Sequence, residues 1–536
     1  MRESCRLVWF PGAGQAVACL GQHAMATDAP AVSGTRAVYP WSSGRNHLRS
    51  GGSGSCQPDW FGRVRAATSS WEDPLACLRI TVWHTGSVAV RHVCWEVVVG
   101  RPRITVIGTG YLGATHSACL AELGFEVLGV DVDEAKVGKL SRGEVPFFEP
   151  GLEPILQRNL SAGRLAYTTS FAEAGAFGEI HFLCVGTPSK QDGFAADLQY
   201  VDSALKSLLP HLQTGALLVG KSTVPAGTAA LIADRLADTA TDDVDLAWNP
   251  EFLREGFAVA DSLKPDRIVI GVRSHRAEQR LREVYAPLTQ AGVPLIVTDY
   301  ATAELVKVAA NAFLATKISF INAMAEVCET TGADVMQLSK VLSYDDRIGG
   351  RYLNAGLGFG GGCLPKDIRA FMARARELGV DQALSFLGEV DGINRRRRAR
   401  VVDLARELLG GSLRGKRVCV LGAAFKPNSD DVRDSPALDV ASGCQSQGAV
   451  VQVYDPKAMD NARKSYPHLA YAESAMAAAE QADVVLHLTE WAEFGDMDPA
   501  RVGEVVVGKR IVDGRNALDK NRWRRAGWTY RALGRQ

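Results

Sequence analysis

The chain has 536 residues, of which 46% are hydrophobic and 22% are charged, an ordinary globular composition with room for three or four domains. Lysine plus arginine equals aspartate plus glutamate, 60 against 60, so the formal net charge is zero. This balance, and the lack of an apolar run long enough to cross a bilayer, argue against a nucleic-acid partner and against a membrane partner.

The eleven cysteines form no CxxC pair and no metal-ligand spacing, so we expect no bound metal. The cysteines after residue 100 lie far apart in the sequence. Such spacing fits reduced thiols and a cytoplasmic location.

The first hundred residues differ in composition from the rest of the chain. They hold six of the ten tryptophans and five of the eleven cysteines but no lysine, and residues 42–56 are rich in glycine and serine. Two interpretations stay open: a poorly ordered appendage, or a segment that is not translated, with the true start near residues 97–108. We favour the second, because the composition changes where a clear first strand begins.

Residues 104–133 predict a β-α-β unit that binds a dinucleotide. An apolar strand leads into GTGYLG, in which Gly108, Gly110 and Gly113 form GxGxxG before a helix. These glycines permit a tight turn, a close backbone approach to a pyrophosphate and close packing of helix on strand. Asp131 ends the second strand, where a carboxylate can bond ribose hydroxyls; two more acids follow it, which favours NAD over NADP.

Alternating strands and helices continue after this unit. Strands are expected over 104–107, 126–130, 180–188 and 217–228, and another begins at 245. Because ligands bind beyond the carboxyl ends of parallel strands, Thr187 and Thr223 are candidate cofactor or active-site hydroxyls; capping of the next helix is the alternative. Glu251 and Glu255 come later, and a helical start there would place both on one face, usually a solvated one.

A long helix is expected from Thr302 to Thr331, since this stretch contains neither glycine nor proline and is apolar at helical spacing. At 1.5 Å per residue it would extend roughly 45 Å, enough to bridge two domains or to pair with a partner chain. Lys307 and Asn311 lie four residues apart within it. The lysine can reach solvent along its stem, or the two side chains can form an anion-facing pair.

Residues 358–367, GFGGGCLPKD, place Cys363 after three glycines and before Lys366 and Asp367. A lone cysteine is usually a small buried residue, whereas a thiol beside a cation can act as a nucleophile. Glycine leaves room for another group to approach closely. On the residues alone both roles stay open.

A second series of strands and helices follows the arginine run RRRRAR. We expect a solvated helix face at this run rather than a nucleic-acid contact, since no aromatic residue interleaves with it. Strands are expected over 417–421, 450–456, 482–491 and 510–516. The loop GAAFKPNSDDVRDSP has a single leading glycine and is no second dinucleotide fingerprint; Lys426, Arg433 and Arg515 at strand ends suit phosphates held by side chains.

Together these blocks resemble the UDP-glucose/GDP-mannose dehydrogenase family. The resemblance covers about residues 102–530 and rests on GTGYLG, FFEPGL, GKSTVPAGT, NPEFLREG, DRIGGRYLNAGLGFGGGCLPKD, GAAFKP and VDGRN, in that order. It implies an α/β fold with two Rossmann-like parallel-sheet domains joined by a long central helix. The implied division is an N-terminal extension at 1–100, an NAD domain at 101–298, a central helical and dimerisation domain with the cysteine loop at 299–411, and a UDP-sugar domain at 412–536.

The resemblance also implies the chemistry. The family oxidises C6 of a sugar from alcohol to carboxylate, so two hydrides leave one carbon for two NAD molecules. Cys363 matches the nucleophile that adds to the intermediate aldehyde, and the thiohemiacetal becomes a thioester that water hydrolyses. The glycines before it would let C6 and the nicotinamide crowd the sulfur. DRIG and the GLGFGGGC loop favour UDP-glucose as the substrate.

The same resemblance assigns the other site residues. Lys307 and Asn311 match groups that stabilise the developing oxyanions at O6, Asp367 an acid near the nucleophile, Glu251 the base for thioester hydrolysis, and Thr223 a residue that touches water and cofactor. For NAD the matching residues are Gly108, Gly110, Tyr111, Leu112, Gly113, Asp131, Lys136, Thr187, Thr223, Glu255, Lys366 and Arg433. For UDP-glucose they are Phe252, Leu253, Arg254, Glu255, Lys307, Asn311, Tyr352, Leu353, Asn354, Ala355, Gly356, Gly360, Lys426 and Arg515. Arg347 matches an arginine that reaches the substrate of a neighbouring subunit, which implies at least a homodimer.

Other readings stay open. Asn249 before Pro250 is shared with the GDP-mannose branch, and Gly362 stands where many relatives have serine, so GDP-mannose and UDP-N-acetylmannosamine are alternative substrates. A two-electron dehydrogenase of a hydroxy acid would need no nucleophile like Cys363. A non-catalytic nucleotide-binding protein would not need the catalytic set described above.

Overall fold

The computed structural model describes residues 77–84, 87–94, 101–191, 193–238 and 243–535. The chain separates into two units, Met1–Gly100 and Arg101–Gln536. In the first unit, strands β1 (Cys77–His84) and β2 (Ser87–Cys94) pair antiparallel. The other residues of the N-terminal extension, and with them the prediction that it is poorly ordered or not translated, lie outside the described residues.

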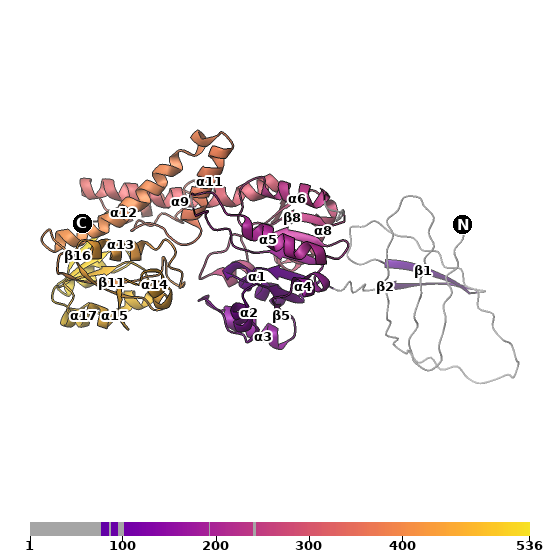
Figure 1. The fold of residues 1–536 in the computed structure, drawn as a ribbon, viewed down its shortest axis with the longest axis horizontal. Helices are drawn as coiled ribbons and strands as arrows, with labels where there is room; N and C mark the ends of the chain where they lie inside the picture. Colours follow the sequence, from indigo (N-terminus) through magenta and orange to yellow (C-terminus); the bar gives the residue numbers. More distant parts are fainter. Residues whose placement is uncertain (1–76, 85–86, 95–100, 192, 239–242, 536) are drawn as a thin grey trace. The chain divides into compact units, whose positions relative to one another are not determined.

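The second unit begins with an eight-stranded sheet covered by helices on both faces (Figure 1). Its strands, in spatial order, are β10 (Leu295–Thr298), β9 (Ile268–Val272), β8 (Asp245–Trp248), β7 (Leu217–Gly220), β6 (Ile180–Leu183), β3 (Ile104–Ile107), β4 (Val127–Val130) and β5 (Leu165–Thr168). Neighbouring strands are parallel except β8 and β9. Its helices are α1 (Tyr111–Glu122), α2 (Glu134–Ser141), α3 (Leu152–Ser161), α4 (Phe171–Phe177), α5 (Gln199–Leu208), α6 (Thr228–Asp238), α7 (Ala258–Leu263) and α8 (His275–Gln290), with the 3₁₀ turn η1 (Leu209–His211) after α5.

The strands of this sheet are continuous apolar runs because both faces are buried. Val106 and Ile107 are adjacent in β3 yet belong to two different hydrophobic cores, one on each face of the sheet. Side chains that could serve a ligand are therefore confined to the loops at the strand ends.

The chain ends in a second, six-stranded sheet in which all neighbours are parallel. Its strands, in spatial order, are β13 (Ala470–Tyr471), β12 (Val450–Tyr454), β11 (Arg417–Leu421), β14 (Val484–His487), β15 (Arg510–Asp513) and β16 (Thr529–Ala532). The helices are α13 (Pro436–Ser446), α14 (Met459–Ser465), α15 (Ala475–Ala479), α16 (Ala492–Asp496), α17 (Pro499–Val505) and α18 (Lys520–Arg525). Two parallel-sheet α/β domains confirm the predicted fold class.

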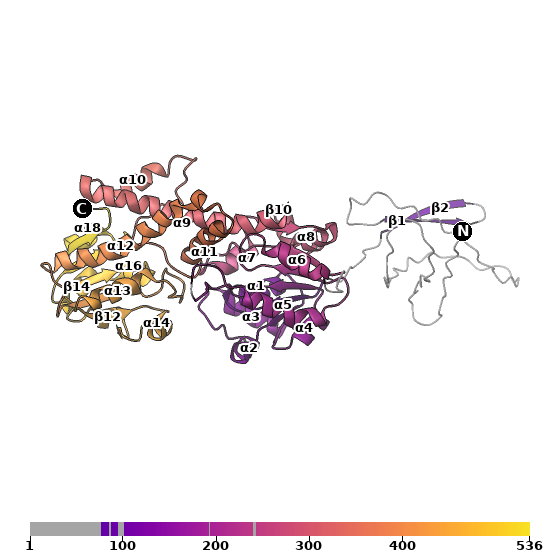
Figure 2. The ribbon, with the colours of Figure 1, turned by 45° about the horizontal axis from the view of Figure 1, so that its top comes forward.

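In chain order, the two sheets are separated by α9 (Tyr300–Thr331), α10 (Val335–Leu342), α11 (Leu364–Glu377), the turn η2 (Asp381–Leu384) and α12 (Phe386–Leu408). Figures 1 and 2 show α9 extending from the first sheet domain to the second. The predicted long helix is confirmed as α9. It begins where the Asp299 carboxylate accepts a hydrogen bond from the Thr302 amide at 2.8 Å, and it ends at Gly332, whose φ is 78°. It packs against β9, α11 and α12, so it joins the sheet domains through the residues that it buries.

The membrane prediction needs a correction at α9. Among the described residues this helix is long and apolar enough to cross a membrane by length and composition, which the sequence analysis did not anticipate. The helix packs against α11 and α12. A core helix can be as long and as apolar as a membrane-spanning helix, so length and composition do not separate the two.

The arginine run of α12 is not the solvated face that its composition predicted. Arg397 and Arg398 are only 1% and 8% exposed. Arg397 pairs with Glu329 of α9 at 2.7 Å, and Arg398 pairs with Asp434 at 2.8 Å while donating to the Phe359 carbonyl at 2.9 Å. Consecutive helical residues point in different directions, so a run of like charges reaches several neighbours rather than one face.

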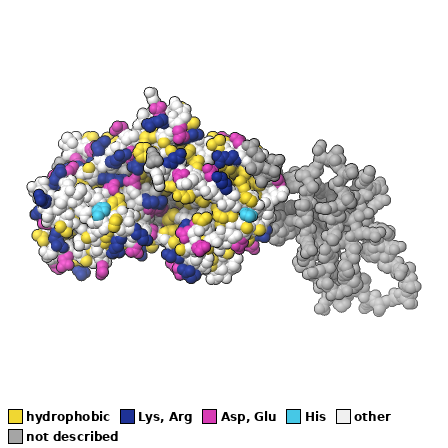
Figure 3. Space-filling model, in the orientation of Figure 1, with side chains coloured by type: hydrophobic (Ala, Val, Ile, Leu, Met, Phe, Trp, Pro, Cys, Tyr) yellow, Lys and Arg dark blue, Asp and Glu magenta, His cyan; other side chains and the backbone are white. Residues whose placement is uncertain are grey.

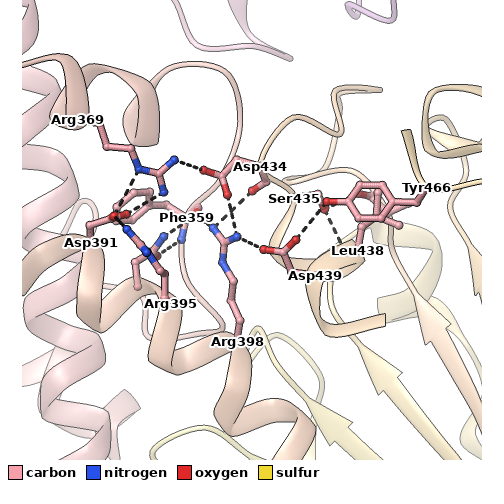
Figure 4. Close-up of polar contacts among 12 residues, drawn as sticks. Phe359, Arg369, Asp391, Arg395, Arg398, Asp434, Ser435, Leu438, Asp439 and Tyr466 are labelled. Atoms are coloured by element: carbon pink, nitrogen blue, oxygen red, sulfur yellow. Dashed lines mark hydrogen bonds and ion pairs between the residues drawn. The ribbon is translucent and has the colours of Figure 1, made fainter. Parts of the chain in front are cut away.

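Figure 4 shows how these ion pairs join three segments. Arg369 of α11 contacts Asp391 of α12 at 3.0 Å and Asp434, in the loop before α13, at 3.2 Å. Arg398 reaches the other oxygen of Asp434 and also pairs with Asp439 of α13. The helix that begins after Cys363 is thereby tied to the second sheet domain.

We expect Arg398→Met to lower the free energy of unfolding by about 3 kcal/mol, because it removes a buried guanidinium that bonds the Phe359 carbonyl and the half-buried Asp434 and Asp439. Arg396→Met on the same helix is the matched control. Its side chain is 54% exposed and lies 3.7 Å from Glu326, so its loss should cost less than about 1 kcal/mol. Urea denaturation of the two variants measures the difference, and equal midpoints would show that the network contributes no stability.

Candidate active site

The loop between β3 and α1 has the geometry that the glycine fingerprint predicted. Gly108 has φ 88°, and a Cβ there would lie 2.9 Å from the backbone of Val185. A Cβ on Gly113 would lie 1.8 Å from the Gly108 carbonyl oxygen, whereas a Cβ on Gly110 meets nothing within 4 Å. Two glycines thus allow the turn and the helix packing, and the third leaves open space at the start of α1, where a pyrophosphate would bind.

Asp131 is an ionised carboxylate at the end of β4. Its Oδ2 accepts hydrogen bonds from the Thr109 amide at 2.8 Å and from Lys136 Nζ at 2.8 Å. Burial opposes ionisation, but Lys136 and the backbone amides lower the pKa of Asp131. An anion fixed here suits ribose hydroxyls, and with the open glycine loop it fits an NAD molecule.

The corresponding carboxylate in the second sheet domain serves the loop itself. Asp455, at the end of β12, accepts from the Ala423 and Ala424 amides at 2.8 and 2.9 Å, and it is 1% exposed. This use of the carboxylate agrees with the prediction that the GAAFKP loop is no second dinucleotide fingerprint.

A cavity of about 900 Å³ lies among the first sheet, the central helices and the second sheet. In Figure 3 the surface is hollowed between the two sheet domains, and Lys and Arg side chains lie along the hollow. The cavity brings together these predicted residues: Glu251, Phe252, Leu253, Arg254, Glu255, Lys307, Asn311, Tyr352, Asn354, Ala355, Gly356, Gly360, Cys363, Lys426 and Arg515.

The other predicted residues lie apart from this lining. Leu353 is buried in a small core, and Thr187 donates to the Thr223 carbonyl at 2.7 Å, which links the loops after β6 and β7 instead of capping a helix. Arg347 is 88% exposed and pairs with Asp345 at 2.6 Å, so it does not reach the cavity of its own chain.

Cys363 stands at the start of α11 and faces the cavity. Crowding by protein atoms and the charge of Glu251 raise the pKa of the thiol to about 12, against the opposing charge of Lys307. The resting sulfur is therefore protonated, and a base must take its proton before it can attack an electrophile.

Two carboxylates near Cys363 each pair with a lysine, Glu251 with Lys307 and Asp367 with Lys366 at 2.7 Å. Lys307 Nζ lies 2.8 Å from Glu251 Oε1, and both side chains are buried. Burial would lower the pKa of Lys307, but Glu251, Cys363 and Asp367 together raise it. Asn311 donates to Asp367 at 2.6 Å, so α9 and α11 meet beside the sulfur. Lys307 does not extend to solvent, the alternative that the sequence left open.

The two glutamates after β8 do not share a helical face. Residues 251–254 form no helix, so Glu251 turns to Lys307, whereas Glu255 accepts from Ser429 at 3.2 Å and from Arg433 at 3.3 Å across the domain boundary. The expectation of a solvated face was wrong because each carboxylate has its own partner, Lys307 for Glu251 and the Ser429–Arg433 loop for Glu255.

The glycines before Cys363 line the cavity and also leave room for neighbouring protein atoms. A Cβ on Gly360 or Gly362 would lie 2.3 Å from Asp434 or Arg433, and one on Gly361 would lie 2.7 Å from the Phe425 ring. The loop after β11 packs directly on this backbone. Because these glycines also line the cavity beside Cys363, the expectation that they let substrate and nicotinamide crowd the sulfur stays a prediction.

Arg515 and Lys426 meet at the same loops. The Arg515 guanidinium donates to the carbonyls of Leu488, Gly358 and Phe425 at 2.8, 3.0 and 2.8 Å. It therefore holds the cysteine loop against the second sheet. Burial lowers the pKa of Lys426, which makes an anionic ligand in the cavity a favourable neighbour for this ammonium.

Sequence reasoning missed two positioning residues. Glu149, in the block FFEPGL, accepts from the Gly256 and Ala258 amides at 2.6 and 2.7 Å and so holds the turn after Glu255. Asn394 of α12 accepts from the Phe359 amide at 2.7 Å and donates to its carbonyl at 2.9 Å. Glu149 could have been noticed from the sequence, because it is a carboxylate between two aromatic residues and a proline. No sequence pattern indicated Asn394.

Glu255 makes the stability pH-dependent. Burial and the charge of Asp431 raise its pKa to about 7, against Arg433. Between pH 4.5 and 7 the folded protein then binds more protons than the unfolded chain, so this group's contribution to the free energy of unfolding falls as pH rises. We expect Glu255→Gln to gain stability relative to the parent over this window. Urea denaturation midpoints at pH 4.5 and at pH 7 measure this gain in stability. Glu389→Gln, at an exposed position of α12, is the control and should show no gain.

The chain matches three family models in order. They describe the UDP-glucose/GDP-mannose dehydrogenase family: its NAD binding domain over residues 102–289, its central domain over 301–396 and its UDP binding domain over 419–520. The UDP-glucose 6-dehydrogenase of Rhizobium meliloti (strain 1021) is 41% identical over 436 residues, which are 81% of this chain and 99% of that protein.

Solved structures show the same likeness. A UDP-glucose dehydrogenase from Pyrobaculum islandicum superposes with a TM-score of 0.75 at 39% identity, covering 82% of this chain and all of that one. A UDP-D-ManNAc dehydrogenase from Pyrococcus horikoshii superposes with a TM-score of 0.71 at 27% identity, covering 81% and 99%. These matches agree with the glycine loop at 108–113 and with the cavity around Cys363. They show that the chain belongs to the UDP-glucose/GDP-mannose dehydrogenase family.

Proposed function

We propose that the protein is a UDP-glucose 6-dehydrogenase (EC 1.1.1.22), which oxidises UDP-glucose to UDP-glucuronate with two NAD per sugar. The observation that carries this proposal is the convergence of Cys363, the Lys307–Glu251 pair and the Asn311–Asp367 pair in one cavity between two nucleotide-type sheets. Relatives at 39–41% identity are named for UDP-glucose, and the relative named for UDP-D-ManNAc is 27% identical.

The first oxidation converts the C6 alcohol to an aldehyde. Bound NAD supplies the acceptor for the hydride that leaves C6 in each oxidation. Lys307 and Asn311 hold O6 and stabilise the negative charge that grows on it; one such donor is typically worth roughly 3 kcal/mol. For this role Lys307 must exchange its contact with Glu251 for the substrate oxygen.

The thiol is needed because the aldehyde has no further alcohol to oxidise. As Cys363 Sγ forms a C–S bond to C6, the C6–O6 double bond becomes single and the thiol proton passes to O6, which gives a thiohemiacetal with O6 again beside Lys307 and Asn311. Loss of the second hydride leaves a thioester. Glu251 then takes a proton from water, the water oxygen bonds to C6, and the C–S bond breaks to release the acid and the thiol. Asp367 and Thr223 share in the proton transfers.

The remaining predicted residues complete the proposal. Gly108, Gly110, Tyr111, Leu112, Gly113, Asp131, Lys136, Thr187, Thr223, Glu255, Lys366 and Arg433 would hold NAD. The turn 252–255, Tyr352 to Gly356, Gly360, Lys426 and Arg515 would hold UDP-glucose. The domains would follow the division at residues 101, 299 and 412. A cytoplasmic location is part of the proposal and is supported by the free cysteines among the described residues.

A homodimer through α9 is part of the same proposal. Phe313, Phe320 and Val327 are 66%, 50% and 52% exposed and lie seven residues apart, on one stripe of the helix. Large exposed apolar side chains in a row favour a protein contact. A second copy would cover this stripe and bring its Arg347 toward the substrate.

Phe320→Glu should convert the dimer to a monomer, since a charge would be buried in an apolar contact. Light scattering after size-exclusion chromatography gives the mass. Val507→Glu, at a site as exposed but in the second sheet domain, is the control that should leave the mass unchanged. A monomeric parent protein would contradict the proposal.

The function is tested by the NADH formed per UDP-glucose consumed, with the sugar limiting at pH about 8. Two NADH per sugar support the proposal. One NADH would mean that the reaction stops at two electrons and that Cys363 is not a nucleophile. None, with two from GDP-mannose or UDP-N-acetylmannosamine, would move the protein to another branch of the family.

A further inference from the structure

A buried lysine that the mechanism does not use lines the same cavity as Glu251. Lys221 follows β7 and is 7% exposed, and it lines the inner part of the cavity. Its Nζ donates to the Asn249 side-chain oxygen at 2.9 Å, an oxygen that also accepts from Tyr285 of α8. Asn249 lies two residues before Glu251, so this anchor belongs to the same turn.

The groups that face Lys221 come from every element around it. They are Cys184 after β6, Glu251, Lys307 of α9, His116 of α1 and Tyr285 of α8. Burial and the charge of Lys221 keep the pKa of His116 well below its usual value, and burial lowers the pKa of Lys221 to about 8. Near neutral pH the charged members of this group are therefore Lys221, Glu251 and Lys307.

The reaction changes this balance. In the resting site Lys307 is the close partner of Glu251, at 2.8 Å. When Lys307 turns to the substrate oxygen, Glu251 remains buried without that partner, and a buried carboxylate without a cation takes up a proton. A protonated Glu251 cannot accept a proton from water.

We propose that Lys221 is a positioning residue that keeps Glu251 ionised while Lys307 is engaged at O6, and so supports thioester hydrolysis rather than hydride removal. Its ammonium is held 2.9 Å from the side-chain oxygen of Asn249, two residues before Glu251, and both Lys221 and Glu251 line the cavity. Its charge is also among the causes that lower the pKa of Glu251. The Asn249 bond keeps it in place. This inference rests on the proposed function.

The test is a single-turnover experiment on the full chain with UDP-glucose and saturating NAD. For Lys221→Met we expect a burst of two NADH per site at near the parent rate, followed by decay of the thioester on Cys363 at least tenfold slower than in the parent. Intact mass after acid quench detects the covalent adduct. The acid limb of the decay rate should move to higher pH by about one unit, because loss of a positive charge raises the pKa of Glu251.

Matched variants separate charge from structure. Lys221→Gln keeps a donor for Asn249 without the charge and should behave like Lys221→Met. It also replaces Lys221→Met in the test if the methionine variant fails to fold. Lys221→Arg keeps the charge and should retain the parent pH profile. Tyr285→Phe removes the other donor to Asn249 and should leave the decay unchanged.

Three results would overturn the inference: thioester decay in both neutral variants at the parent rate, equal slowing in Tyr285→Phe, or an unshifted pH profile. These results are distinct from a failure of the proposed function. That failure would show in the parent protein, as fewer than two NADH per sugar.

Discussion

Cys363→Ser is expected to abolish UDP-glucuronate formation, with a loss of turnover of roughly a thousandfold or more. A serine hydroxyl can add to the aldehyde only weakly and cannot form the thioester. The side chain lines the cavity without supporting a core, so binding of NAD and of UDP-glucose should persist. Product analysis gives the loss, and titration calorimetry with each ligand tests binding.

Cys444→Ala is the matched control for this loss. Cys444 is a free, buried thiol of α13 and lies outside the cavity lining. Its removal should leave turnover near the parent value. If Cys363→Ser instead weakened the binding of both ligands, the cysteine would be a structural residue and the covalent route would be wrong.

Lys307→Met is expected to lower kcat/KM by roughly a hundredfold to a thousandfold, about 3 to 4 kcal/mol of transition-state stabilisation. The variant also takes the close cation from Glu251, whose pKa Lys307 lowers in the resting site. With that cation gone, the pKa of Glu251 rises, and the acid limb of the pH–rate profile should move to higher pH. Steady-state kinetics from pH 6 to 9 measure both effects.

Lys340→Met is the control on the neighbouring helix α10, at an exposed position outside the cavity lining. It should keep the parent kinetics and pH profile. A Lys307→Met enzyme with a raised KM, an unchanged kcat and an unshifted profile would show that Lys307 only binds the substrate.

The order of elements could be predicted from the sequence because local patterns specify it. The strand at residues 104–107 and the strand at 417–421 match β3 and β11 to the residue, since buried parallel strands are continuous apolar runs between turn residues. The glycine fingerprint with Asp131 specified its own turn geometry. The blocks around Cys363 and Lys307 indicated the chemistry through their resemblance to one family.

What local patterns could not show is which distant charges meet. The arginine run of α12 was interpreted as a solvated face, yet Arg397 and Arg398 are buried against Glu329 and Asp434. The pair Glu251 and Glu255 was placed on one helical face, yet the two carboxylates point to different domains. Such partners lie tens to hundreds of residues away, where sequence periodicity carries no information.

By itself the sequence determined the two sheets, the long helix and the NAD-type loop, because each depends on neighbouring residues, and the family resemblance pointed to Cys363 as the proposed nucleophile. Only the tertiary structure decided the state of the site: a protonated Cys363 thiol, a Lys307–Glu251 pair at 2.8 Å, and Lys221 in the lining of the same cavity. Burial and charge set these states, and both arise when β7, α9 and α11 converge. The glycine run before Cys363 lines the cavity and also leaves room for Phe425 and its loop, and only packing shows what fills the space that a glycine leaves.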